Sequence, residues 1–309
     1  MNSYSIESTQ ENIYPVIHSA LSIDVEDGIN ILMRDLFNVD KSPTTRVIDN
    51  VNILLDLFNE KDVRATFFIL GEIATTYPSL VKSIASGGHE IGVHGYNHDQ
   101  LFKLSPGQVK EDIYKAKEII EDVTGKEVYG FRAPAFSIME STSWALDIIS
   151  ELGFKYDSSI VPARANRYGW PGFSREINRL NLKGGGSLIE VPLSVIDVMG
   201  KTLPACGGGY LRYFPYSFTR KAFLTISKQR PVIVYLHPYE LDTAKYPDYF
   251  YEAMASMRLV KRIPLSFYRL NKGTVKKKLG LLIDEFPFKP IIDIITGLEK
   301  SSEIAVRSF

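Results

Sequence analysis

The sequence predicts an α/β fold in which about seven strands alternate with helices along the chain. Short β-branched and aromatic runs are separated by segments of helical periodicity, and no internal repeat or convincing linker divides the chain. In addition, polar or charged residues directly follow the predicted strands. Parallel α/β sheets and barrels place their active sites at this end of the strands, so an active site is expected there.

In the first half of the chain, strands and helices follow one another closely. The alternation into Ile23 and Val25 predicts a strand that ends in a cluster of acids. Apolar residues at helical spacing predict a helix over 47–59, and the run VRATFFIL predicts a buried strand over 63–70. The other elements expected here are helices over 78–86 and from Ser105-Pro106 to about 123, and a strand over 89–93.

The second half continues this alternation and adds longer connections. Residues 162–187 carry many Gly, Arg and Asn residues with little periodicity, so we expect a long loop or insertion over the barrel mouth. The glycine run at 206–210 predicts a turn that lets the backbone approach another group closely. The other expected elements are strands over 128–132, 154–157, 188–193 and 231–236, and helices over 141–152 and 217–227.

Composition excludes several classes of protein. Lys plus Arg and Asp plus Glu are equal at 36 each, so the basic excess that favours nucleic-acid binding is absent. A single cysteine, Cys206, excludes an intrachain disulfide framework and fits a reducing compartment. The polar N-terminus does not have the pattern of a signal peptide, and no apolar run reaches the ~18 residues of a membrane-spanning helix. We therefore expect a cytoplasmic protein.

The C-terminal segments 276–282 and 286–295 mix lysine with apolar residues. Such segments favour one of two interpretations, namely peripheral contact with a membrane surface or a packed, partly amphipathic pair of helices. We prefer the packed helices.

The stretch GGHEIGVHGYNHDQL places His94 and His98 four residues apart, directly after the predicted strand at 89–93. Two imidazoles at this spacing can turn toward one point if the turn after the strand is tight or helical. Neutral imidazole is the commonest protein metal ligand, and catalytic zinc sites usually take three protein ligands and leave a position for water. The histidine pair therefore predicts a metal site whose third ligand comes from elsewhere in the chain.

Other chemically active side chains also follow predicted strands. The three carboxylates after the first strand repel one another unless a cation lies among them, although a solvated acidic loop is the alternative. One acid with two histidines suits Zn²⁺, with Mn, Co or Ni as alternatives. Metal-assisted hydrolysis also needs a carboxylate that accepts a proton and a group that protonates the leaving group. The candidates are Asp24, Glu26, Asp27, Arg132, Asp157 and His237.

The ordered motifs SIDVEDG, TFFILG, VHGYNH, FRAP, YDSS and LHPYE resemble those of the polysaccharide deacetylase family, which shares the NodB homology domain. This resemblance covers roughly residues 19–240 and implies a distorted (β/α)₇ barrel that uses a metal to remove N- or O-acetyl groups from sugars. The segment from Pro264 also resembles the C-terminal extension of a subgroup associated with bacterial surface-polysaccharide genes. We expect a polar lead at 1–18, the barrel at 19–263 and a helical extension, packed on the barrel, at 264–309.

By position in the family's motifs, Asp27 is expected to be the metal carboxylate beside the two histidines. The family's FDDG pattern corresponds to Val25-Glu26-Asp27-Gly28, which puts Glu26 where the family's aspartate base stands. Asp24 is the alternative base, because it lies two residues earlier on the same face of an extended strand. The sequence leaves Asp24 and Glu26 open.

The resemblance also implies roles for residues further along the chain. Arg132 would hold the base ionised through a charge-assisted pair. Ala135 stands at the family's Tyr position, and its backbone N–H would stabilise the oxyanion whatever the side chain. His237 would be the general acid, with Asp157 as the charge partner that raises its pKa. Alternatively, Asp157 would cap the turn into the serines that follow it.

The resulting hypothesis is a metal-dependent hydrolase that removes an acyl group, expected to be N-acetyl, from a sugar of a surface polysaccharide or its precursor. The expected substrate is a lipid-linked, nucleotide-linked or oligosaccharide sugar, and no nucleic acid is expected. One alternative is an amidase that acts on another C–N bond, such as a cyclic amide or formyl group. The departures from the family pattern at Glu26 and Ala135 favour a second alternative, a catalytically altered glycan-binding protein with the same barrel.

Overall fold

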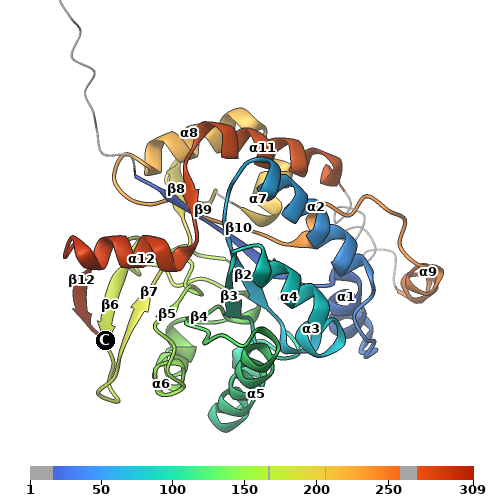
Figure 1. Cartoon of the computed structure of the whole chain (residues 1–309), viewed down its shortest axis with the longest axis horizontal. Coiled ribbons are helices and arrows are strands. Elements are labelled where there is room, and N and C mark those ends of the chain that lie inside the picture. The colour runs from blue at the N-terminus through green and yellow to red at the C-terminus, as the bar shows by residue number, and fades with distance from the viewer. Residues whose placement is uncertain (1–16, 166–167, 206, 258–269) are drawn as a thin grey trace, which may run out of the picture.

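The computed structural model describes residues 17–165, 168–205, 207–257 and 270–309 of the chain. Among these residues, seven strands lie side by side in one parallel run, in the order β10-β1-β2-β3-β4-β5-β7. Their bounds are β1 Ser19–Val25, β2 Thr66–Ile69, β3 Glu90–Val93, β4 Gly130–Phe131, β5 Tyr156–Asp157, β7 Ser187–Glu190 and β10 Ile233–Leu236. Helices cover the outer side of these strands (Figure 1). The α/β fold with seven parallel strands is therefore confirmed.

Most of the helices that connect these strands begin and end close to the predicted positions, but the helix at Gly71–Thr76 was not predicted and the one expected from residue 141 begins at Ala145. Their bounds are α2 Arg46–Glu60, α3 Gly71–Thr76, α4 Pro78–Ser86, α5 Pro106–Thr124, α6 Ala145–Glu151 and α8 Tyr216–Ile226. In α5, the Ser105 side chain accepts a hydrogen bond from Gln108 N, and the Gln108 side chain bonds back to Ser105 N. This capping box fixes the start of the helix, and Gly125 with a φ of 64° ends it.

The two faces of each strand contact different apolar clusters. In β1, Leu21 and Ile23 belong to the main core, whereas Ala20 belongs to a second cluster on the other face of the sheet. Because side chains alternate along a strand, Asp24 shares the face of Ala20. Glu26 follows two residues later, so the end of β1 carries two carboxylates to the same inner face.

The barrel is not closed by backbone pairing. Among the described residues, no ladder joins β10 to β7, the two ends of the parallel run. Instead, Ile233 N of β10 donates to the side-chain Oγ of Ser194, in the segment after β7, at 2.8 Å. The other edge of β7 pairs antiparallel with β6 Asn178–Asn181. The barrel expected from the sequence is therefore distorted in that it stays open between β10 and β7.

The region after β5 contains more regular structure than the sequence predicts. β6 lies inside the stretch 162–187, so the expectation of a long loop there is wrong for that part, and residues 166–167 lie outside the described residues. A hairpin of β8 Val195–Val198 and β9 Lys201–Pro204 then follows. The glycine run expected to form a turn begins α7 Gly208–Tyr213, while Cys206 lies outside the described residues.

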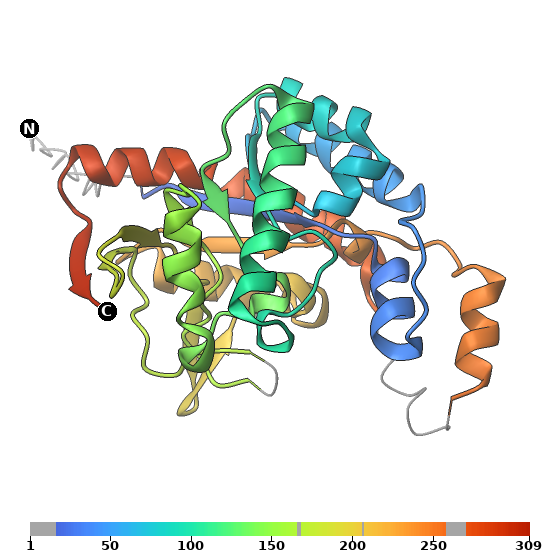
Figure 2. The ribbon, with the colours of Figure 1, turned by 90° about the horizontal axis from the view of Figure 1, so that it is seen from below.

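Two further helices lie next to each other away from the sheet, as Figure 2 shows. α1 Gly28–Phe37 directly follows the acidic end of β1, and α9 Asp248–Ala255 packs against it. Their contact is a small apolar cluster whose buried members are Ile29, Leu32, Met33, Tyr246 and Phe250.

The C-terminal segment is part of the barrel's packing. α11 Val275–Glu285 buries Leu279 and Leu282 in the main core, and α12 Ile291–Lys300 buries Ile291 and Ile294 in the second cluster. It is not purely helical, because β11 Phe288–Lys289 pairs with β1 and β12 Ala305–Ser308 pairs with β6. The apolar faces of both helices are thus buried, as the packed-helix interpretation expects. Across the residues with described structure, no helix has the length and apolarity needed to cross a membrane.

Candidate active site

Three side chains at the ends of β1 and β3 converge on one point. Glu26 Oε1 lies 3.0 Å from Nε2 of His94 and 3.0 Å from Nε2 of His98. Their ligand atoms lie within 4.8 Å of one another, and they are the one such group of three or more His, Cys, Asp or Glu side chains that could hold a metal ion in the described chain. A carboxylate with two imidazoles is the protein donor set of known catalytic zinc sites, so these residues fit a divalent cation.

The groups around Glu26 keep it in the form that binds cations. Burial by itself raises the pKa of the Glu26 carboxyl. Charges on His98 and His237, together with hydrogen bonds from His94 and His98, outweigh burial and hold the pKa well below its usual range. A carboxylate must be ionised to bind a metal, so Glu26 meets this requirement.

Asp27, the metal carboxylate expected from the sequence, has a different place. Its Oδ1 accepts a hydrogen bond from Ile29 N at 3.0 Å, which makes it the N-cap of α1, and its Oδ2 accepts one from Thr44 N. Side chains alternate at the end of the strand, so Glu26 shares the inner face with Asp24 and Asp27 turns toward the helix. Glu26 therefore has the place beside the histidines that was expected for Asp27.

The two histidines are positioned in different ways. His94 continues the ladder of β3, since its N–H donates to Ile69 O at 2.9 Å, and its Nδ1 lies 2.8 Å from Arg132 O. His98 has a left-handed φ of 63°, which is uncommon for a residue other than glycine. The turn between them brings the ring centroids to 5.6 Å, so the structure places the predicted pair at one site.

Asp24 lies next to this group and is bound by Arg132. Arg132 Nη1 donates to Asp24 Oδ1 at 2.7 Å and to Ser22 Oγ at 2.8 Å. The other side of the guanidinium donates to Ser158, from Nη2 to Oγ at 2.8 Å and from Nε to the carbonyl at 2.9 Å. Arg132 and Asp24 are both buried. These four bonds fix the guanidinium and, through it, one oxygen of Asp24.

His237 follows β10 and faces both carboxylates. Its Nε2 lies 3.9 Å from Asp24 Oδ2 and 3.8 Å from Glu26 Oε1, and its Nδ1 lies 3.6 Å from Glu240 Oε2. The Tyr239 ring stacks on the imidazole, with centroids 4.7 Å apart and planes 14° apart. Burial lowers the pKa of His237, but the charges of Glu26, Glu240 and Asp24 outweigh it and raise the pKa to about 9.

Asp157 is not the carboxylate beside His237. Its two oxygens accept hydrogen bonds from Ser159 Oγ at 2.6 Å and Ser159 N at 3.0 Å, so it caps the turn after β5 as the alternative interpretation expected. Burial and the charge of the neighbouring Asp157 raise the pKa of the Glu190 carboxyl well above its usual range. Glu240 has the place beside His237 that the sequence analysis expected for Asp157.

Ala135 lies in a short turn after β4, at Pro134–Phe136. Both Ala135 and Phe136 have left-handed φ angles, 51° and 52°. Each such residue costs on the order of 1–3 kcal/mol, and strained residues of this kind cluster at active sites. Ser159 Oγ accepts a hydrogen bond from Ala133 N at 2.7 Å, so the Asp157 turn supports the backbone that leads to Ala135.

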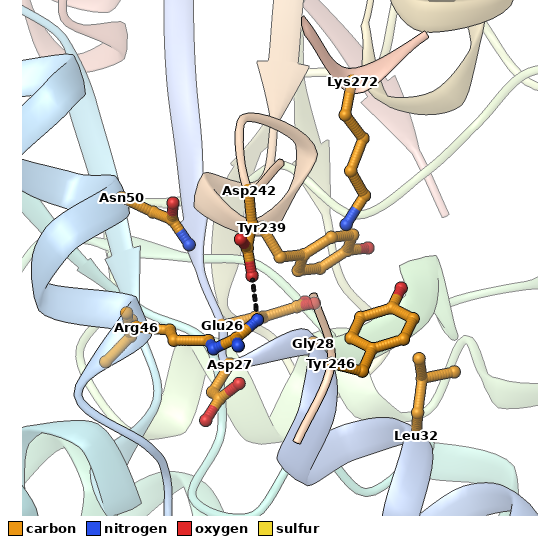
Figure 3. A pocket seen from close by; sticks show the side chains of 11 residues that line it. Glu26, Asp27, Gly28, Leu32, Arg46, Asn50, Tyr239, Asp242, Tyr246 and Lys272 are labelled. Carbon is orange, nitrogen blue, oxygen red and sulfur yellow. Dashed lines mark hydrogen bonds and ion pairs between the residues drawn. The ribbon is translucent and has the colours of Figure 1, made fainter. Parts of the chain in front are cut away.

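A pocket lies beside Glu26, on the side of Tyr239 (Figure 3). A Cβ on Gly28 would lie 2.8 Å from Tyr239 Cγ, so only glycine allows this ring to pack so closely over the start of α1. Lys272 extends toward Tyr239 from the C-terminal segment, and its Nζ lies 5.7 Å from the ring centroid. Arg46 on α2 pairs with Asp242 at 3.1 Å. Segments far apart in the sequence therefore meet next to the candidate metal carboxylate.

Several groups of the site were missed by reasoning from the sequence. They are Arg34, Ser22, Ser158, Ser159 and Glu240. Glu240 had a signal, because it stands three residues after His237 within the motif LHPYE. Ser22 also lies within the motif SIDVEDG, and Ser158 and Ser159 lie within YDSS, but the groups they bond depend on where Arg132 and Asp157 lie in the folded barrel.

Known proteins resemble two stretches of the chain. Residues 37–156 match the family model described as polysaccharide deacetylase, and residues 158–296 match one described as a domain of unknown function, DUF3473. The first stretch contains His94, His98 and Arg132, and the second contains His237. Strands of both stretches belong to one parallel run, so the two matched regions build a single site together.

Among curated proteins, the peptidoglycan-N-acetylglucosamine deacetylase of Bacillus cereus is 34% identical over 140 residues, which are 44% of this chain and 48% of that protein. The peptidoglycan deacetylase of Helicobacter pylori is 34% identical over 108 residues, 35% of this chain and 36% of that protein. The chain thus matches less than half the length of these relatives.

A solved structure from Mycobacterium smegmatis, assigned as a polysaccharide deacetylase, shares the fold. It has a TM-score of 0.64 and 19% identity, and the alignment covers 96% of this chain and 95% of that one. The match therefore extends over nearly the whole of both chains, including the C-terminal segment. Residues 37–156 are thus similar to the polysaccharide deacetylase family, and the chain as a whole shares the fold of the M. smegmatis structure.

Proposed function

We propose that this chain is a metal-dependent hydrolase that removes an acyl group, in the first place N-acetyl, from a sugar. One observation carries the proposal: Asp24, bound by Arg132 at 2.7 Å, lies next to a group of one carboxylate and two imidazoles, of which Glu26 and His94 are buried and His98 is partly buried. A base beside a cation site is what hydrolysis of an amide requires. The match of residues 37–156 to the polysaccharide deacetylase model supports a deacetylase, and the names of the B. cereus and H. pylori relatives support an acetylated sugar as substrate.

Glu26, His94 and His98 would hold the cation in this proposal. Their donor set suits Zn²⁺ first, with Mn, Co or Ni as alternatives. When bound, the cation would act as a Lewis acid on the acyl carbonyl and would make water more acidic. The convergence of their ligand atoms to within 4.8 Å of one another and the burial of Glu26 and His94 support this assignment.

Asp24 is the proposed general base. Glu26 faces both histidines, which leaves Asp24 as the free inner-face carboxylate at the end of β1. Its Oδ1 is occupied by Arg132, and its Oδ2 points to the side of His237. Asp24 would take a proton from the attacking water while the water oxygen forms its bond to the acyl carbon. The geometry therefore favours one of the two bases that the sequence left open.

His237 is the proposed general acid. Its Nε2 faces the two carboxylates, and the carboxylates of Asp24 and Glu240 favour the protonated imidazole. As the C–N bond breaks, His237 would give its proton to the amine nitrogen, so that acetate and a free amino sugar leave. The N–H of Ala135, held by its left-handed backbone, would donate to the acyl oxygen as charge develops there.

As the substrate, we propose a sugar of a surface polysaccharide or of its precursor. The precursor would be a lipid-linked sugar, a nucleotide-linked sugar or an oligosaccharide. Peptidoglycan, which the two relatives are named for, is such a polysaccharide. The single cysteine supports a reducing, cytoplasmic setting, in which precursors are the available form.

The test is acetate release by the purified chain after removal of metal and reloading with Zn²⁺. Oligomers of N-acetylglucosamine, a nucleotide-linked N-acetyl sugar and a lipid-linked one are the substrates to compare. We expect release that needs the metal and that is lost in His94→Asn. His18→Asn, at the opposite end of β1, is the matched control and keeps full activity. Stoichiometric metal without release from any acylated sugar would contradict the proposal.

A further inference from the structure

Arg34 connects helix α1 to the turn that carries His98. α1 begins directly after Glu26, with Asp27 as its N-cap, and Arg34 lies two turns along it. From there Arg34 Nη1 donates to the carbonyl of Asn97, the residue that precedes His98. We propose that Arg34 is a positioning residue that holds His98 in the geometry needed for metal binding. This inference rests on the proposed metal site.

The turn between the two histidines is held by bonds from three helices. Gly71 N donates to Gly95 O at 2.9 Å and Glu72 N donates to Tyr96 O at 3.1 Å, both from the start of α3. From α5, the Asp112 carboxylate accepts a hydrogen bond from Tyr96 N at 2.9 Å. Arg34 on α1 supplies the bond to the last peptide of the turn. Of these bonds, the one from Arg34 is therefore nearest in sequence to His98.

His98 depends on such support more than His94 does. The Nδ1 of His94 lies 2.8 Å from Arg132 O, so a bond to the ring sets the direction of that imidazole. The Nδ1 of His98 is buried and has no hydrogen-bond partner among the described residues. His98 also has a left-handed φ of 63°, a conformation that persists only when its surroundings enforce it. The backbone therefore has to set the direction of the His98 ring.

Glu72 keeps Arg34 in place for this task. Arg34 Nη2 lies 2.8 Å from Glu72 Oε2, and the two side chains are only 21% and 11% exposed. A guanidinium can bind a carboxylate with one part of its fork and a carbonyl with another, which a lysine cannot do at once. The second acid near Arg34, Asp40, lies 3.3 Å away but is 86% exposed, so it contributes little.

The experiment is titration of the metal-free chain with Co²⁺, whose visible absorption reports the geometry of its ligands. Arg34→Met should weaken Co²⁺ binding by roughly 10- to 100-fold, the usual loss when a group that orients a ligand is removed, and should change the spectrum. Arg34→Lys should recover part of the affinity, because it keeps one donor. Asp40→Asn should bind Co²⁺ like the unmodified chain.

Two further variants separate positioning from general stability. Arg175→Met removes a 2.8 Å ion pair with Asp197 away from the site, and it should leave the Co²⁺ affinity and spectrum unchanged. If Arg34→Met does not fold, Glu72→Gln carries the same test, because it removes the anchor and leaves the arginine.

The outcomes distinguish this inference from the proposed function. Unchanged affinity and spectrum in a folded Arg34→Met or Glu72→Gln chain would overturn the positioning role alone. An equal loss of affinity in Arg175→Met would overturn it too, since the effect would then be general. An unmodified chain that binds no Co²⁺ would overturn the proposed metal site and this inference with it.

Discussion

Arg132 Nη1 lies 2.7 Å from Asp24 Oδ1, and the two side chains are 0% and 1% exposed. The remaining donors of Arg132 bind Ser22 and Ser158, so the guanidinium has no freedom to follow another carboxylate. Removing one partner of a buried ion pair is strongly destabilising, which makes this relationship a fixed part of the barrel. Asp24 therefore presents its second oxygen in one direction, whereas Glu26 is directed at the histidines.

If Glu26 is the metal carboxylate, substitution of Glu26 should reduce metal affinity, whereas substitution of the adjacent Asp27 should not. Glu26→Gln should lose metal affinity by more than the roughly 10- to 100-fold expected for groups that only orient a ligand. Asp27→Asn should bind the metal normally, because asparagine is an equally good N-cap, and should lose some stability, because its amide NH₂ cannot accept the hydrogen bond from Thr44 N. Metal content after dialysis and calorimetric titration check both variants. Loss of metal in Asp27→Asn with retention in Glu26→Gln would restore the ligand set expected from the sequence.

The environment of His237 predicts its titration in the metal-free chain. The pKa of about 9 lies above the ordinary 6.5, so the extra stability from the protonated form is complete below pH 6.5 and is lost as pH rises through 9. Glu240→Gln removes a charge 3.6 Å from Nδ1 and should lower the midpoint by roughly 1 pH unit. Imidazole NMR signals followed against pH measure it. Glu252→Gln, which removes an exposed carboxylate, is the control and should leave the midpoint unchanged. A midpoint near pH 6.5 in the unmodified chain would contradict the prediction.

Glu90 predicts a pH dependence of stability at the other end of the barrel. Its carboxyl accepts hydrogen bonds from Thr66 Oγ1, Tyr156 OH and Ile292 N, at 2.5, 2.8 and 3.1 Å. Burial raises its pKa from 4.5 to about 7, and the hydrogen bonds only partly offset this. Since the folded-state pKa is raised, the contribution of Glu90 is complete below pH 4.5 and is lost as pH rises through 7.

Unfolding of the metal-free chain by urea at several pH values tests this contribution. The loss attributable to Glu90 is on the order of 3 kcal/mol between pH 4.5 and 7, and Glu90→Gln should remove that part of the slope. Glu111→Gln, an exposed carboxylate on α5, is the control and should keep it. An identical pH slope in Glu90→Gln would show that the carboxyl titrates normally.

The fold was predictable because its signals are local. The alternation at Ile23 and Val25 gives the end of β1, and Ser105 with Gln108 gives the start of α5. The strands β4 and β5 are shorter than predicted, since only Gly130–Phe131 and Tyr156–Asp157 pair with their neighbours. Strand pairing is a tertiary property, so the apolar run alone overestimates its length.

The candidate site was predictable where residues adjoin in sequence and not where they meet through the fold. The four-residue spacing of His94 and His98 predicted that the two rings meet, and they lie next to each other in the structure. Glu26 and Asp27 were exchanged because α1 was not predicted, although an aspartate before the apolar periodicity of Ile29 to Met33 is an N-cap signal. Whether Asp157 or Glu240 accompanies His237 depends on where β5 and β10 end in space, which no local pattern records.

The most direct test of the whole account is acetate release by metal-loaded Asp24→Asn, with its metal content measured in the same sample. Asparagine keeps an oxygen that accepts the hydrogen bond of Arg132, so the chain should fold with lower stability, but it cannot accept the proton from water. We predict one bound metal, as in the unmodified chain, and a turnover rate lower by about 10²- to 10⁴-fold. A metal-loaded Asp24→Asn chain that releases acetate at the full rate would contradict the account.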